Sequence, residues 1–146
     1  IIELVQSLKL SALQLHGNED EDYIASLAAK LAVIAEKNGH QCQIWQASSV
    51  LDKVPALSAQ VAHHVLDGKS PGSGQSFDWR VLATSKQDLS KSLLAGGLNN
   101  DNITLALAQL TDLDLFGLDL NSGVETSPGI KCREKLKQVF TQIRNY

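Results

Sequence analysis

Short apolar runs alternate along this chain with stretches of helical periodicity, and this alternation constrains the fold more than any other feature of the sequence. Most of these runs are followed by glycine, an acid or an amide, as buried strands often are. The predicted strands are SALQLHG at 11–17, QCQIWQA at 41–47, VAHHVLDG at 61–68, SLLAG at 92–96 and FGLDLNSG at 116–123. Strict alternation of strands with helices predicts parallel βαβ units and an α/β fold.

The segments between the strands carry helix signals. The most regular one spans residues 18–39, with Asn18 as a candidate cap, carboxylates in the first turn and a long apolar stripe. One face of a first helix is marked by Ile1, Leu4, Val5 and Leu8. Further helices are expected around Pro55, on FDWRVLA, on DNITLALAQL and from about Lys131 to Arg144, with a loop at KSPGSGQS.

Strands in this number fit two architectures: an open doubly wound sheet, or an incomplete (β/α)8 TIM barrel with about five of its eight strands. The first units of such a barrel would be missing. The chain contains no methionine, and Ile1 already lies inside an amphipathic pattern, so we expect a piece of a longer polypeptide. Residues 1–146 show no linker, which predicts part of a single domain.

The composition argues against several classes of partner. A formal net charge of -3 leaves no basic surplus to neutralise nucleic acid or an anionic membrane, so small molecules or proteins are the expected partners. No apolar run reaches the ~20 residues of a membrane helix, and the first residues do not resemble a signal peptide, which predicts a cytoplasmic protein. Cys42 and Cys132 lie outside any metal-ligand spacing, so we expect reduced thiols and no metal site.

Functional groups of both architectures gather at the carboxyl ends of the parallel strands. The residues that come after the apolar runs therefore carry the functional prediction. They are Gln14, His16 and Gly17 after the first strand, Asp67 and Gly68 after the third, Gly96 and Gly97 after the fourth, and Asp119, Asn121, Ser122, Gly123 and Glu125 after the fifth.

The turns after the last two strands, AGGL and NSGV, predict a phosphate site. Glycines let backbone N–H groups approach an anion without obstruction, and a (β/α)8 barrel builds its usual phosphate site from the loops after strands seven and eight. An open sheet would place its phosphate loop after the first strand, where LHGNED is acidic and has one glycine. The barrel is therefore favoured, with Gly96 and Gly97 as a mere tight turn as the alternative.

Two further side chains at the strand ends are candidates for chemistry. Asp67 ends the run HVLD, where partial burial can turn a carboxyl group into a general acid or base; the alternative is an aspartate that only hydrogen-bonds the following loop. His16 lies at the mouth of the predicted site and is a weaker candidate for ligand contact. His63 and His64 precede the end of their strand, which predicts structural roles.

These motifs together resemble the C-terminal three-quarters of phosphoribosylanthranilate isomerase, a (β/α)8 barrel family of tryptophan biosynthesis. The segments that carry the resemblance are LQLHGNED, VLDGKSPGSGQSFDW, LLAGGLNNDN and GLDLNSGVETSPGIK, in the family's order and separation. The Asn-Glu after LHG and the terminal RNY resemble the bacterial form fused behind indole-3-glycerol-phosphate synthase.

The resemblance implies an Amadori rearrangement of N-(5-phosphoribosyl)anthranilate to 1-(2-carboxyphenylamino)-1-deoxyribulose 5-phosphate, without cofactor or metal. Asp67 matches the family's general acid, which protonates the ring oxygen as the furanose opens. The phosphate-contacting turns are matched by Gly96, Gly97, Ser122 and Gly123. Asp119 matches a carboxylate that lines the pocket, and His16 a histidine at its rim.

The chain departs from the family in ways that predict an inactive fragment. The family's general base is a cysteine on the first barrel strand, and its arginine for the anthranilate carboxylate follows the second. In this match the chain runs roughly from helix 3 to helix 8 of the barrel and contains neither strand. Loss of a general base costs ~10² to 10⁴ in rate. Cys42 enters its strand from the opposite end, so it cannot replace that base. Cys132 stands where the family usually has a first-turn aspartate, at a cost of ~0.3 to 1 kcal/mol.

An incomplete barrel would also expose two strand edges and an apolar interior, which predicts homo-oligomers through those edges. The residues alone are also compatible with two other functions. One is a non-catalytic half-barrel that only binds phosphate, and the other is an open, flavodoxin-like binding module.

Overall fold

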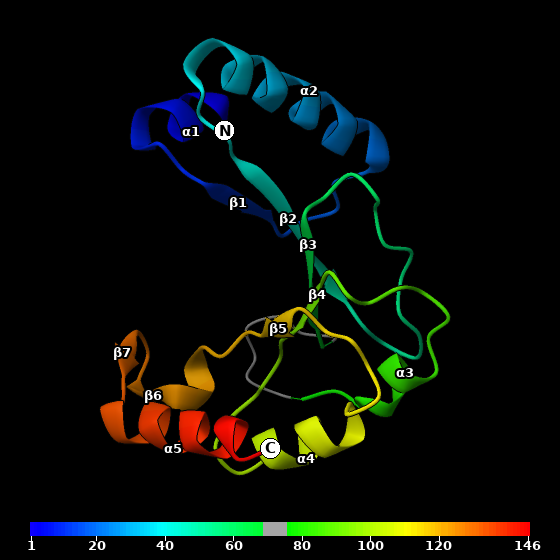
Figure 1. Ribbon diagram of the computed structural model, residues 1–146, viewed down its shortest axis with the longest axis vertical. Helices are drawn as coiled ribbons and strands as arrows, with labels where there is room; N and C mark the ends of the chain where they lie inside the picture. Colours follow the sequence, from blue (N-terminus) through cyan, green and yellow to red (C-terminus); the bar gives the residue numbers. More distant parts are fainter. Residues whose placement is uncertain (69–75) are drawn as a thin grey trace. The chain divides into compact units, whose positions relative to one another are not determined.

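The computed structural model describes residues 1–68 and 76–146, so most of the expected loop KSPGSGQS lies outside the described residues. Its main sheet has five strands in the order β1-β2-β3-β4-β5 (Figure 1). The strands are β1 (Ala12–Leu15), β2 (Gln43–Ser49), β3 (His63–Asp67), β4 (Ser92–Leu94) and β5 (Gly117–Leu118). The β1–β2 and β4–β5 pairs are parallel. All five predicted strands are therefore present, and the α/β prediction is confirmed.

The chain divides into two compact units. The first consists of residues Ile1–Ser48 and Ala56–His64, and the second of Ser49–Pro55 and Val65–Tyr146. Each unit therefore combines two separate segments of the chain.

In the first unit, helix α2 (Glu21–Asn38) begins and ends at specific capping residues. Its N-cap is Asp20, whose carboxylate accepts a 2.8 Å hydrogen bond from the backbone N–H of Tyr23, so the prediction of Asn18 as the cap is wrong by two residues. The helix ends at Gly39, whose φ of 67° suits a residue without a side chain. The N-cap is Asp20 and not Asn18 because the side chain that accepts the capping hydrogen bond must belong to the residue directly before the first helical residue, Glu21.

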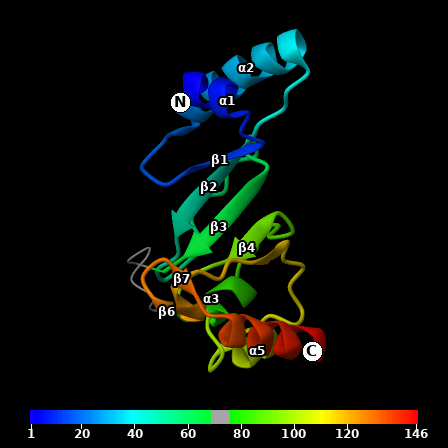
Figure 2. The ribbon, with the colours of Figure 1, turned by 90° about the vertical axis from the view of Figure 1, so that its left-hand side faces the viewer.

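The core of the first unit lies between its two helices and the first strands. Helix α1 (Ile2–Leu8) contacts α2, and both views show the two helices side by side (Figures 1 and 2). The buried cluster contains Val5, Leu15, Ile24, Leu27, Leu31, Ile34, Ile44 and Val61. The prediction of a continuous apolar face on α1 is only partly right, because Val5 is buried while Leu4 and Leu8 are 58% and 64% exposed.

No helix forms around Pro55, which corrects the prediction for this segment: residues 50–62 contain only turns and irregular backbone. Proline has no backbone N–H and disfavours helical geometry at the residue before it, which is Val54. Hydrogen bonds from a side chain hold the end of this segment that belongs to the second unit. Gln87 Nε2 donates to the carbonyl oxygens of Pro55 (2.8 Å) and Val54 (3.3 Å).

The second unit carries helices α3 (Arg80–Ala83), α4 (Ile103–Gln109) and α5 (Arg133–Arg144), all within the predicted segments. A 3-10 turn, η1 (Ser122–Val124), and an antiparallel hairpin of β6 (Glu125–Ser127) and β7 (Ile130–Lys131) follow β5 and were not predicted. Helices α4 and α5 lie against each other (Figures 1 and 2). None of the described helices is long and apolar enough to cross a membrane.

Candidate functional site

Six of the seven predicted site residues belong to the second unit: Asp67, Gly96, Gly97, Asp119, Ser122 and Gly123. The seventh, His16, is exposed directly after β1 in the first unit. The second unit therefore holds the geometry of the candidate site.

Gly96 lies against the carboxyl group of Asp67. Gly96 follows β4 and has a φ of +85°, a backbone conformation that residues with a side chain rarely adopt. A Cβ placed on Gly96 would overlap Asp67 Oδ1 and come within 3.1 Å of the Gly68 nitrogen. Asp67 Oδ1 in turn accepts a 2.7 Å hydrogen bond from the Gly68 N–H. Glycine at position 96 is thus required by both backbone conformation and the approach of the carboxylate.

The loop after Gly96 is organised around the carbonyl group of Gly97, which has a φ of +66°. This carbonyl oxygen accepts hydrogen bonds from Asn99 Nδ2 (3.1 Å) and Asn102 Nδ2 (2.9 Å). Asn102 Oδ1 also accepts from the Asn99 backbone N–H at 2.9 Å. Side-chain amides therefore replace the regular backbone ladder here, which explains the run NNDN that follows the glycines.

The turn after β5 packs directly against this first loop. A Cβ on Gly123 would overlap the carbonyl oxygen of Leu98 and lie 2.8 Å from the Cβ of Asn99. No side chain fits between the two backbones, so Gly123 is required by close approach. The structure thus brings together the two glycine-containing turns that the sequence analysis paired.

Backbone donors are left over in both turns. Within residues 1–68 and 76–146, no hydrogen bond accounts for the backbone N–H groups of Gly96, Gly97, Ser122 and Gly123. Unpaired N–H groups of successive loop residues are the usual donors to bound anions. Two turns in contact, each with unpaired donors, make an arrangement that can bind a phosphate group.

The surroundings of the Asp119 carboxyl group shift its pKa. Desolvation of its carboxyl group, followed by the negative charge of Asp67, raises the pKa of Asp119, while the Lys131 cation opposes the shift. Part of the Asp119 side chain is nevertheless exposed to solvent, so water screens these effects. The Asp119 carboxyl group therefore holds its proton more readily than an isolated aspartate does.

Lys131 is a residue near the site that the sequence analysis did not single out. Its Nζ donates to Glu125 Oε1 (2.6 Å), to the Asn121 carbonyl oxygen (3.1 Å) and to Asn121 Oδ1. Hydrogen bonding to Lys131 is also the main reason why the pKa of Glu125 is lowered. Glu125 and Lys131 are cross-strand partners in the β6–β7 hairpin. The sequence signal that could have indicated this pair is the placement of Glu125 and Lys131, which carry opposite charges, on either side of the Ser-Pro-Gly turn.

The remaining histidines make packing contacts. His64 is 4% exposed, and its Nε2 hydrogen-bonds the Ser58 carbonyl oxygen at 3.0 Å. The His63 ring packs edge-on against Trp45 with 4.9 Å between ring centroids. These contacts agree with the structural roles predicted for both residues.

Both cysteines are free, as predicted. Burial raises the pKa of the Cys42 thiol, which makes it a poor nucleophile. Cys132 corrects an expectation: it is the N-cap of α5 rather than a first-turn residue, and its side chain makes no capping hydrogen bond. Cys132 therefore destabilises α5 through the missing N-cap hydrogen bond and not through the loss of a first-turn carboxylate. Among the described residues, no group of three or more His, Cys, Asp or Glu side chains could hold a metal ion.

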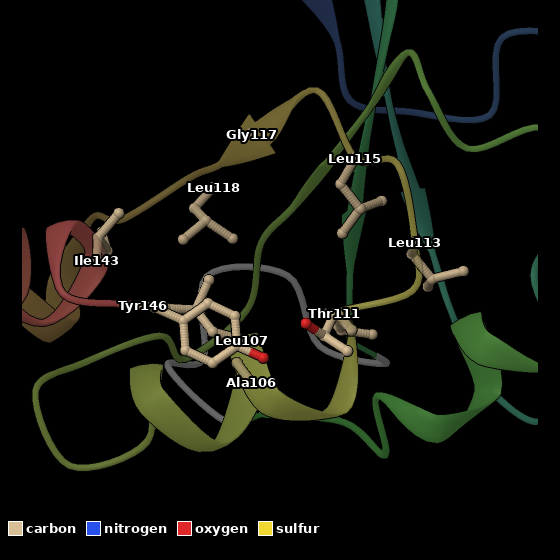
Figure 3. A pocket seen from close by; sticks show the side chains of 10 residues that line it. Ala106, Leu107, Thr111, Leu113, Leu115, Gly117, Leu118, Ile143 and Tyr146 are labelled. Carbon is tan, nitrogen blue, oxygen red and sulfur yellow. The ribbon is translucent and has the colours of Figure 1, made fainter.

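An apolar pocket of about 300 Å³ lies elsewhere in the second unit. Figure 3 shows side chains from α4, β5 and the C-terminal residues around it, among them Leu107, Leu118 and Tyr146. None of the six site residues lines this pocket. Its apolar lining suits burial against other protein better than it suits a sugar phosphate.

Comparison with known proteins agrees with the resemblance seen in the sequence. The sequence profile of the family described as N-(5'phosphoribosyl)anthranilate (PRA) isomerase matches residues 1–142. The tryptophan biosynthesis protein TrpCF of Yersinia pestis is 43% identical over 145 residues, which are 99% of this chain and 28% of that protein. TrpCF of Vibrio cholerae is 41% identical over 151 residues, covering 100% of this chain and 29% of that protein.

Solved structures show the same relationship. The phosphoribosyl anthranilate isomerase of Thermus thermophilus superposes with a TM-score of 0.70 at 29% identity, over 99% of this chain and 66% of that one. TrpF of Jonesia denitrificans gives a TM-score of 0.66 at 30% identity, over 99% and 64%. The chain thus spans less than a third of the curated relatives and about two thirds of the solved isomerases. On the match over residues 1–142 and these relatives, the chain belongs to the N-(5'phosphoribosyl)anthranilate isomerase family.

Proposed function

We propose that this chain is the C-terminal part of an enzyme that rearranges N-(5-phosphoribosyl)anthranilate to 1-(2-carboxyphenylamino)-1-deoxyribulose 5-phosphate in tryptophan biosynthesis. Family membership supports the reaction, and the curated relatives are named as tryptophan biosynthesis proteins. Within the family, one solved isomerase, 21% identical with a TM-score of 0.64, is described in complex with a reduced form of this product. The TrpCF relatives support a parent that is also fused to indole-3-glycerol-phosphate synthase.

The observation that carries the proposal is the contact between the two glycine-containing turns. Gly123 packs on Leu98 and Asn99, and both turns have backbone N–H groups without a partner among residues 1–68 and 76–146. In the proposed site, the N–H groups of Gly96, Gly97, Ser122 and Gly123 donate to the phosphate oxygens of the substrate. This binding requires no basic side chain, which fits a chain with a net charge of -3.

Asp67 is the proposed general acid. It lies at the end of β3 beside Gly96, so a substrate whose phosphate occupies the turns would place its sugar near this carboxyl group. In its protonated form, Asp67 donates a proton to the furanose ring oxygen, and the C1–O bond breaks as the amine nitrogen forms an imine. Removal of the C2 proton then gives the enol that becomes the ketone. Asp119 lines the proposed pocket, and its raised pKa favours the protonated form of its own carboxyl group.

The fold proposed for the parent is a (β/α)8 barrel, of which residues 1–146 form an incomplete part of one domain. Two observations support it. Strand β5 stands last in the sheet order and pairs with β4, and an open apolar pocket adjoins it. The solved isomerases are about half as long again as this chain, by the 66% coverage of the Thermus protein. The remaining units of the parent would supply the general base.

Several further properties belong to this proposal. The chain by itself does not turn over substrate, because the family's cysteine base is not among its residues. It requires no cofactor or metal. The parent enzyme acts in the cytoplasm on a small sugar phosphate, without nucleic acid or membrane. The exposed strand edges of the chain alone favour homo-oligomers at high concentration.

Complementation tests the proposed function. The chain is purified alone and together with the N-terminal part of the isomerase region of Yersinia pestis TrpCF, and product formation is followed by absorbance or fluorescence. The chain alone should be inactive and the mixture active. Asp67→Asn should abolish the activity of the mixture, while Asp112→Asn should not.

Three results would contradict the proposal. Turnover by the chain alone would refute the assignment of the missing base. An Asp67→Asn mixture as active as the wild type would remove Asp67 from the mechanism. A mixture that binds inorganic phosphate without any turnover would favour the non-catalytic, phosphate-binding half-barrel.

A further inference from the structure

The loop that would bind phosphate is held from outside by helix α5. Asn100 lies in this loop, and its backbone carbonyl oxygen accepts a 3.1 Å hydrogen bond from Gln142 Nε2. Its side-chain Nδ2 donates to Gln138 Oε1 at 2.7 Å. Two glutamines one helical turn apart therefore hold a single loop residue by both its main chain and its side chain.

Gln142 makes a second contact that fixes its amide group. Its Oε1 accepts a 2.9 Å hydrogen bond from Thr104 Oγ1 on helix α4. With its Oε1 bonded to α4 and its Nε2 bonded to the loop, the side chain has a defined orientation and is half-buried. A glutamine serving only as a polar surface residue needs neither partner.

Asn100 is rigidly connected to the glycines through its neighbours. The side chains of Asn99 and Asn102, on either side of it, both donate to the carbonyl oxygen of Gly97. A displacement of Asn100 should therefore shift the Gly97–Leu98 peptide, which contains this carbonyl group, and with it the adjoining Gly96–Gly97 peptide. The N–H groups of Gly96 and Gly97, in the two peptides that precede this carbonyl group, have no partner in the described part of the chain.

We propose that Gln142 is a positioning residue for the phosphate group: its donation to the Asn100 carbonyl oxygen orients the backbone N–H groups of Gly96 and Gly97. Backbone donors bind an anion well only when they are held in place before it arrives, because ordering a loose loop subtracts from the affinity. The inference rests on the proposed phosphate site, and it assigns to α5 a role beyond packing.

The test compares variants that break one contact of Gln142 at a time. Gln142→Leu removes both contacts without adding charge. Gln142→Glu keeps an acceptor for Thr104 but has no donor for Asn100. Thr104→Val removes the contact to α4 and keeps the loop contact. Gln109→Leu, an exposed position on α4, is the matched control for loss of a surface glutamine.

Two readouts are needed. The first is amide hydrogen exchange of residues 96–102, followed by NMR in the protein without ligand. Gln142→Leu and Gln142→Glu should speed exchange in this loop several-fold, Thr104→Val should have a smaller effect, and Gln109→Leu should leave the exchange unchanged. The second is the Kd for inorganic phosphate, which should rise about 2- to 10-fold in Gln142→Leu, as expected from one lost hydrogen bond, and less in Thr104→Val.

The outcomes separate this inference from the proposed function. Equal effects of Gln142→Leu and Thr104→Val on the loop and on phosphate affinity would overturn the positioning role and leave Gln142 as a packing residue. A wild-type chain that does not bind phosphate would count against the proposed phosphate site, and the exchange measurement would still decide whether Gln142 orders the loop.

Discussion

The carboxyl group of Asp67 occupies the space that a side chain at residue 96 would need. Gly96 therefore connects two parts of the candidate site, the proposed general acid and the proposed phosphate loop. Whatever changes the backbone at residue 96 should also move the carboxylate. This coupling is directly testable by substitution.

Gly96→Ala should destabilise the protein by about 2–4 kcal/mol, because positive-φ strain of about 1–3 kcal/mol adds to displacement of Asp67. The matched control is Gly129→Ala, at a φ of +82° with nothing within 4 Å of the added Cβ, which should cost only the strain. Urea unfolding measures both. Asp67→Ala should reduce the extra cost of Gly96→Ala, and equal costs for the two alanine variants would show that the overlap relaxes freely.

Asp119→Asn should stabilise the protein at neutral pH. The native state raises the pKa of Asp119, so the folded protein binds this proton more tightly than the unfolded chain does. The stabilisation that protonated Asp119 contributes to the folded state is therefore fully present below the ordinary aspartate pKa of 3.8. This stabilisation is lost as the pH rises through the raised pKa. The Tm of Asp119→Asn should exceed that of the wild type at pH 7, and the difference should shrink toward pH 3.

Asp112→Asn is the control for this comparison, because Asp112 is exposed and makes no hydrogen bond or ion pair among the described residues. Its Tm should match the wild type throughout. A Tm difference for Asp119→Asn that stays constant between pH 3 and pH 7 would rule out the linkage.

Lys131→Met should move the titration of Glu125. Loss of the hydrogen bond from Lys131 removes the main cause of the lowered pKa, so the pKa of Glu125 should rise toward its ordinary value. Carbon-detected NMR of the Glu125 carboxyl group measures this change. The loss of stability should be small, since the Lys131 side chain is 42% exposed and water screens the ion pair. An unchanged Glu125 titration would show that the ion pair does not persist in solution.

Cys132→Ser should stabilise helix α5. Cys132 is the N-cap and its thiol makes no capping bond, whereas a serine hydroxyl at the same place can accept from an N–H of the first turn. The expected gain is about 0.5–2 kcal/mol in urea unfolding. Cys132→Ala is the control and should bring no gain; equal stability of the Ser and Ala variants would mean that the cap is satisfied in another way.

Much of the second unit could be predicted from its sequence, but with limits that have physical causes. Apolar runs and glycines located the strands and the two turns, since burial and backbone freedom depend on local residue type. The hairpin after Val124 was missed because its strands are two and three residues long, too short for a periodic pattern. The empty cap at Cys132 was missed because the helix begins at Arg133, two residues later than the pattern indicated.

The α/β alternation, the family, and the residue types that a phosphate turn and a proton donor need could all be recognised from local patterns in the chain. Which of these residues meet is visible only in the folded protein: Gly123 packs on Leu98, Asp67 fills the space beside Gly96, and Gln142 reaches Asn100 from a helix 42 residues away. Periodicity reports which face of an element is buried. It carries no information about which two loops touch, because that depends on packing between elements distant in the chain.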